Sequence, residues 1–176
     1  MKTIKNNSGL LILVLLVVAI AFLRMFIPFP NVTPVAAIAL FSAAYFKRKE
    51  VAMILPITIL LISDVFIGFY SPLLMAGVYG SFILIALIGF VLRRKINFAT
   101  VVGGSLASSV IFFLVTNFVV WLEGLWYPLT GQGLMMCYYS ALPFFRYEVF
   151  GTLAFTSVFF GSWALINRYS VVPQKA

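Results

Sequence analysis

Long apolar runs alternate with short polar stretches along this chain of 176 residues. A helix needs about 20 mostly apolar residues to cross a bilayer. On that basis the runs predict six helices, at residues 10–27, 34–46, 51–69, 73–92, 98–121 and 147–167. Residues 122–145, rich in Gly, Pro and Tyr and almost uncharged, are predicted to form a long aromatic outer loop. The pattern therefore predicts an all-α integral membrane protein, a compact bundle of about six transmembrane helices forming one domain over residues 1–176.

Composition supports the membrane assignment. Hydrophobic residues make up 64% of the chain and charged residues 9%, and the mean hydropathy is +1.14. A soluble domain is nearer half apolar and a quarter charged, so a water-soluble fold is excluded.

The net charge of +8 comes from short basic clusters between the apolar runs. With the amino terminus inside, all of them fall on the cytoplasmic side, as the positive-inside rule requires. We therefore expect both termini to be cytoplasmic in the inner membrane of a bacterium. Nucleic-acid binding is not expected, because it needs a continuous basic face. The clusters are Lys2 and Lys5, Lys47–Lys49, Arg93–Lys95, and Arg168 with Lys175.

The first apolar run has a second interpretation. Two lysines precede it, and the small residues Ala19 and Ala21 are typical of a signal-peptide cleavage site. The run is long for a signal peptide, and apolar residues continue after Arg24, so the pattern favours a retained helix.

Several kinds of chemistry have no residues to support them. The chain has no histidine and a single cysteine, Cys137, so a metal site, a cofactor and an intrachain disulfide are not expected. It also has no GxxxxGK[ST] loop, so it cannot hold ATP in the manner of a P-loop protein.

Polar residues at membrane depth are the candidate site. Asp64 stands in the apolar stretch LLISDVFIG, and Arg24, Asp64 and Asn117 all reach the outer third of the bilayer by residue count. Such residues are costly in lipid and mark sites or pathways. We expect Asp64 at the floor of an outward-open cavity under the 122–145 loop. The alternatives are that Arg24 and Asp64 only pair, that Asp64 is neutral, and that Asn117 bonds across helices.

The predicted outer loop also bears on the site. Trp121 and Tyr127 belong either to an aromatic belt at the membrane interface or to a lid over the cavity. Glu123, Arg146 and Glu148 lie near the outer helix ends. Small residues at helical spacing, such as Ala39 and Ala43, indicate close helix packing.

The sequence resembles a family of uncharacterised multi-spanning bacterial membrane proteins regarded as candidate transport proteins, over residues 26–162. The matching pieces are Asn31–Pro34, Ala39–Phe41, Ser63–Asp64, Tyr79–Phe82, Phe112–Asn117, Trp121, Tyr127–Pro128, Gly133–Leu134, Cys137–Tyr138 and Leu142–Phe145. That family has an acidic residue after the glycine at 151, whereas this chain has Thr152.

That family in turn is similar to the S components of energy-coupling-factor vitamin transporters. The resemblance implies a vitamin-like solute bound near the outer face, and a transmembrane coupling subunit with ATPases as partners. It also implies partner docking through Ala39 and Ala43, although S components carry this motif on their first helix and this chain carries it on the second. The residues expected to bind the solute are Asp64, Asn117, Asn31, Trp121, Glu123, Arg24, Arg146 and Tyr127.

The sequence thus favours a membrane transport protein that binds a small organic solute, without enzyme activity of its own. One alternative is an accessory subunit without a ligand. The other is an intramembrane enzyme that uses Asp64, Glu123 and Glu148 as acid and base.

Overall fold

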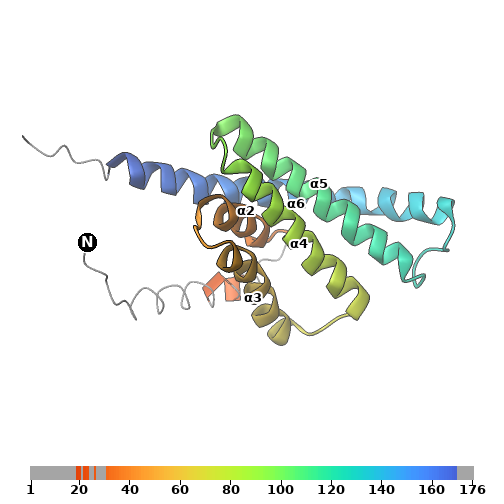
Figure 1. Cartoon of the computed structure of the whole chain (residues 1–176). Coiled ribbons are helices and arrows are strands. Elements are labelled where there is room, and N and C mark those ends of the chain that lie inside the picture. Colours follow the sequence, from red (N-terminus) through yellow and green to blue (C-terminus); the bar gives the residue numbers. More distant parts are fainter. Residues whose placement is uncertain (1–18, 21, 24–25, 27–30, 170–176) are drawn as a thin grey trace, which may run out of the picture.

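The computed structural model of the chain describes residues 19, 20, 22, 23, 26 and 31–169. Within residues 31–169 there are five helices and no strands (Figure 1). Four of them, α3 to α6, are long and apolar enough to cross a membrane. The helices are α2 (Val35–Tyr45), α3 (Lys49–Ile67), α4 (Pro72–Leu92), α5 (Phe98–Leu122) and α6 (Gly131–Tyr169).

The short helix α2 lies at the centre of the bundle. Nine of its 11 residues are buried, because its sequence is apolar all round and its alanines let neighbouring helices approach closely. Gly89 of α4 shows how close this packing is. A Cβ at Gly89 would lie 2.6 Å from both the Ala43 Cβ and the Leu40 carbonyl oxygen. Helices α3, α4 and α6 surround α2 (Figure 1).

Local sequence signals set several helix ends. Asn97 and Thr100 form a capping box at the start of α5, with Asn97 Oδ1 accepting from the Thr100 N–H at 2.9 Å. Ser71 accepts from the Leu74 N–H at the start of α4, where Pro72 occupies the first turn. Helix α3 ends at Ile67 and is capped by Gly68. The φ of Gly68 is 109°, a value that glycine adopts readily and other residues adopt only with strain.

The long aromatic outer loop is the largest correction to the sequence-based prediction. Residues 131–145 are helical and belong to α6, so the connection after α5 covers only residues 123–130. Gly133 lies in the first turn of α6, where a Cβ would meet the Pro128 carbonyl oxygen at 2.0 Å. Pro143 lies within α6 and does not end it. In a transmembrane bundle, neighbouring helices and side chains can satisfy the backbone group that a proline leaves without its usual hydrogen bond.

The predicted helix over residues 10–27 lies mostly outside the described residues, so the count of six helices rests on the sequence. Residues 19, 20, 22, 23 and 26 of this run are helical where the structure describes them. Phe22 packs its ring at 5.2 Å from that of Phe66 on α3. The other predicted ranges before residue 122 agree with the observed helices to within about two residues.

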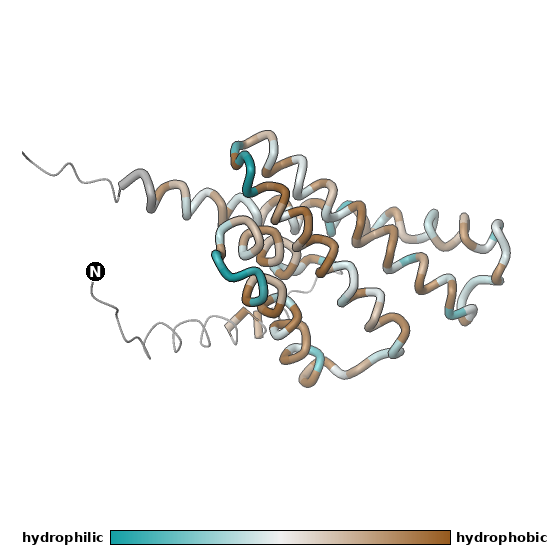
Figure 2. The backbone as a smooth tube through the Cα atoms, in the orientation of Figure 1, coloured by the Kyte–Doolittle hydropathy of each residue, from teal (hydrophilic) through white to brown (hydrophobic). Residues whose placement is uncertain are grey.

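Two basic connections lie at the same end of the bundle. Figure 2 shows the α2–α3 and α4–α5 connections as neighbouring hydrophilic segments. Arg93 joins them, because its guanidinium donates hydrogen bonds to the carbonyl oxygens of Ala43 and Phe46. This arrangement gives the bundle a basic end and, opposite it, an end formed by residues 31–33, the α3–α4 connection and the α5–α6 connection.

Candidate functional site

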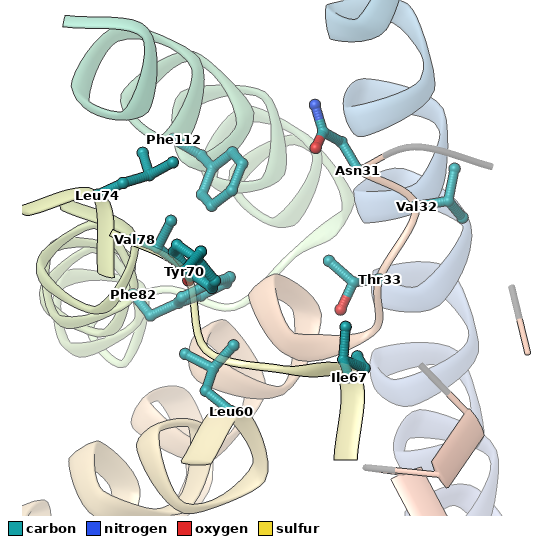
Figure 3. Close-up of a pocket in the computed structure, with 10 residues that line it drawn as sticks. All are labelled: Asn31, Val32, Thr33, Leu60, Ile67, Tyr70, Leu74, Val78, Phe82 and Phe112. Atoms are coloured by element: carbon teal, nitrogen blue, oxygen red, sulfur yellow. The ribbon is translucent and has the colours of Figure 1, made fainter. Parts of the chain in front are cut away.

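A cavity of ≈ 330 Å³, called the main cavity below, lies at the end of the bundle opposite the basic connections. Side chains of α3, α4 and α5 face the 31–33 segment across it (Figure 3). Its lining residues are Asn31, Val32, Thr33, Leu60, Ile67, Tyr70, Leu74, Val78, Phe82 and Phe112.

The main cavity exists because α2 is short. At 1.5 Å per residue, the 11 residues of α2 span about 16 Å, whereas the 21 residues of α4 span about 32 Å. The 31–33 segment continues the path of α2 without forming a helix. Non-helical backbone at membrane depth is tolerated where protein covers it or where it lines a cavity. The central helix therefore leaves part of the bundle unfilled.

The wall of the main cavity is mostly apolar. Phe82 and Phe112 form an aromatic pair in it, with ring centroids 5.4 Å apart. Polar groups come from Asn31, Thr33 and Tyr70, and the described lining contains no charged side chain. Asn31 has a φ of 62°, in the left-handed region that asparagine tolerates better than most residues.

Asp64 lies beside the main cavity and does not line it. Its side chain is 1% exposed, and the Tyr79 hydroxyl donates a hydrogen bond of 2.9 Å to its Oδ2. Leu60 and Ile67, one turn away on either side of Asp64 in α3, are the residues that reach the wall. The described lining of the main cavity therefore does not include Asp64, and the expected loop over it is replaced by the helical residues 131–145; a role of Asp64 in binding a solute stays a prediction. Arg24, its proposed partner, lies outside the described residues.

The expected site residues near the α5–α6 connection do not reach the described lining of the main cavity either. The Asn117 amide donates to the Phe113 carbonyl of its own helix at 2.8 Å. Trp121 Nε1 donates to the Pro128 carbonyl at 3.0 Å and so closes the short connection, in which Tyr127 is half-buried. Glu123 ends α5, and its buried Oε1 has no hydrogen-bond partner.

Arg146 lines a second cavity of ≈ 510 Å³, together with Val32, Tyr147 and Phe150. Its guanidinium stacks on the Tyr147 ring at 4.8 Å from the centroid and donates to the Tyr147 hydroxyl at 3.1 Å. Val32 lines both cavities and packs against Gly151 of α6. The second cavity therefore adjoins the main one through the 31–33 segment.

Glu148 is a buried carboxylate on α6, 2% exposed. Thr152 donates to its Oε1 at 3.0 Å, and its Oε2 is buried without a hydrogen-bond partner. In the described part of the chain no three His, Cys, Asp or Glu side chains lie close enough together to hold a metal ion. Asp64, Glu123 and Glu148 thus form no carboxylate cluster of that kind.

Ala39 and Ala43 are 0% exposed. They pack within the bundle and offer no surface to a partner in this conformation, so the docking role expected for them has no support in the structure. The plain packing role of small-residue pairs accounts for both residues.

Sequence reasoning missed Tyr79 and most of the cavity wall. Apolar wall residues such as Leu74, Val78 and Phe82 carry no signal that separates them from lipid-facing positions. A usable signal came only from the 31–33 segment, where polar residues directly precede a helix too short to span the membrane.

Comparison with curated proteins and with solved structures finds no match to this chain. The resemblance to S components and to candidate transport proteins therefore stays a prediction. The pattern of one protein family matches residues 4–174. This match covers nearly the whole chain, which therefore belongs to the family of unknown function DUF6580.

Proposed function

We propose that this protein binds a small, uncharged organic solute in the main cavity, as the membrane-embedded binding component of a transport system. The observation that carries the proposal is the main cavity itself, ≈ 330 Å³ of space with aromatic and aliphatic walls and three polar side chains. Ligand pockets commonly combine apolar walls with a few polar groups, and they commonly lie between the helices of bundles.

The residues of the wall limit which kinds of solute the main cavity could bind. Because the described lining carries no charge, a strongly charged molecule would lose its hydration without gaining a partner there. The volume lies at the lower end of the ~300–1,000 Å³ usual for ligand pockets. A flat, vitamin-like ring compound suits this volume and these walls, with Asn31 as the candidate for a hydrogen bond.

A role in transport is supported by the position of the main cavity. It lies at the end opposite the basic connections, and the positive-inside rule predicts that these connections are cytoplasmic, which would put the main cavity on the outer side. Non-helical backbone beside a half-length helix is a feature of transporter binding sites. The sequence contains no P-loop, so ATP-driven uptake requires a partner such as a coupling subunit with ATPases.

An accessory subunit without a ligand is the second candidate. Because Ala39 and Ala43 are fully buried, neither candidate can use these two residues to contact a partner in this conformation. The two candidates differ in one observable, which is whether the purified protein retains a small molecule.

The test is mass spectrometry of small molecules extracted from the purified protein. Val78→Trp fills the main cavity, and Leu73→Trp places the same side chain on an exposed position of the same helix. We expect wild type and Leu73→Trp to retain one enriched compound and Val78→Trp to lose it. Identical extracts from folded wild type and Val78→Trp would refute binding in this cavity and favour the accessory role.

A further inference from the structure

A third hollow lies at the basic end of the bundle, between the start of α5 and the second half of α6. This α5–α6 groove has a volume of ≈ 450 Å³. It is defined by Tyr45, Ile96, Asn97, Phe98, Val101, Val102, Ser157, Phe160, Gly161 and Ala164.

The groove lies where α5 and α6 leave space between them at the basic end. Nearer the other end the two helices pack ring against ring, with Phe113 of α5 at 5.6 Å from Tyr138 and 4.7 Å from Phe145 of α6. In the groove no atom lies within 4 Å of the position that a Cβ would take at Gly161. Phe98 is 86% exposed at the edge. The floor is therefore open and mostly hydrocarbon in character.

Exposed cations flank the groove on both sides. Arg94 and Lys95 immediately precede Ile96, while Lys47 and Arg48 follow Tyr45 by two and three residues. Arg93 is already bonded to two carbonyl groups of the α2 end, which holds the two basic connections together beside the groove. Neither connection contains a carboxylate, and Glu50 lies in the first turn of α3. The rim therefore has a strong positive excess.

The geometry points to a binding site for one anionic phospholipid in the α5–α6 groove. Its acyl chain would lie along Phe98 and Phe160 over Gly161, and its phosphate would contact Arg94 and Lys95. Basic pockets between transmembrane helices on the cytoplasmic side are suited to anionic headgroups. A lipid fits better than a partner protein, because an apolar floor beneath a basic rim matches a hydrocarbon chain attached to a phosphate. The inference does not depend on the solute proposed for the main cavity.

Native mass spectrometry of the purified full chain tests this site, with phosphatidylglycerol and phosphatidylcholine added separately. We expect one tightly held phosphatidylglycerol and weak phosphatidylcholine binding. Arg94→Gln with Lys95→Gln should reduce the preference about thirtyfold, which is about 2 kcal/mol. Gly161→Phe should remove the bound lipid, while Gly103→Phe should not, because Gly103 has equal free space on α5 but lies outside the groove lining.

Equal retention of both lipids by wild type would overturn the site. So would unchanged phosphatidylglycerol binding by folded Gly161→Phe. A groove reserved for a partner protein would leave the isolated chain without a specific lipid, and that result would equally count against the inference.

Discussion

The hydrogen bond between Tyr79 and Asp64 gives the sharpest test of the packing between α3 and α4. Asp64 is 1% exposed, and the Tyr79 hydroxyl donates to its Oδ2 at 2.9 Å. Tyr79→Phe keeps the ring and removes the donor. A hydrogen bond to a carboxylate contributes about 1.5–3 kcal/mol, so the free energy of unfolding should fall by about that amount. At about 2–4 °C per kcal/mol for a chain of this size, Tm should fall by about 3–12 °C.

The assay is thermal unfolding in detergent or nanodiscs, with Tyr139→Phe as the control because Tyr139 is 77% exposed. A double-mutant cycle with Asp64→Leu, which has a similar volume and no acceptor, isolates the pair, and we expect a coupling free energy of about 1–3 kcal/mol. Retention of a solute by the main cavity should be unchanged in Tyr79→Phe, since neither residue of the pair lines it. Equal Tm values for Tyr79→Phe and Tyr139→Phe, or additive effects in the cycle, would refute the reasoning.

Three further predictions concern packing, topology and energy supply. Gly89→Ala should destabilise the bundle by about 1–3 kcal/mol, because its Cβ meets α2 at 2.6 Å, whereas Gly80→Ala on the same helix meets nothing within 4 Å and should be neutral; equal unfolding curves would contradict this. Single cysteines at Arg48 and Arg94, with Cys137 replaced, should resist a membrane-impermeant thiol reagent in intact cells, and rapid labelling would break the predicted orientation. The purified chain should not hydrolyse ATP, because it has no P-loop, and phosphate release by the single chain would disprove this.

Most helix positions before residue 122 could be predicted from the sequence. Apolar run length sets which segments can cross a membrane, and the structure has α3, α4 and α5 where those runs occur. The structure adds caps at Gly68, Ser71 and Asn97, which involve only residues close in the sequence. Apolar run length likewise depends on neighbouring residues alone, which is why sequence reasoning could place these helices.

The start of α6 could not be predicted, because the conformation of Gly131, Gly133 and Pro143 depends on what packs around them. In an isolated chain they favour a loop. In the bundle the two glycines lie in the first turn of the helix, and the proline lies within a helix packed against α5. Packing therefore outweighed local preference over residues 131–145.

By itself, the sequence determined the membrane character, the basic clusters and the extents of α2 to α5, because all three follow from residue type and local order. The tertiary structure alone decided which side chains line the main cavity. The main cavity results from a mismatch in length between α2 and its neighbours, and its wall combines residues from three helices, the α3–α4 connection and the 31–33 segment. Asp64 drew attention as a charge among apolar residues, but Tyr79, 15 positions later, bonds to it beside the wall. Contacts between residues so far apart depend on how the helices pack, and the spacing along one helix does not contain that information.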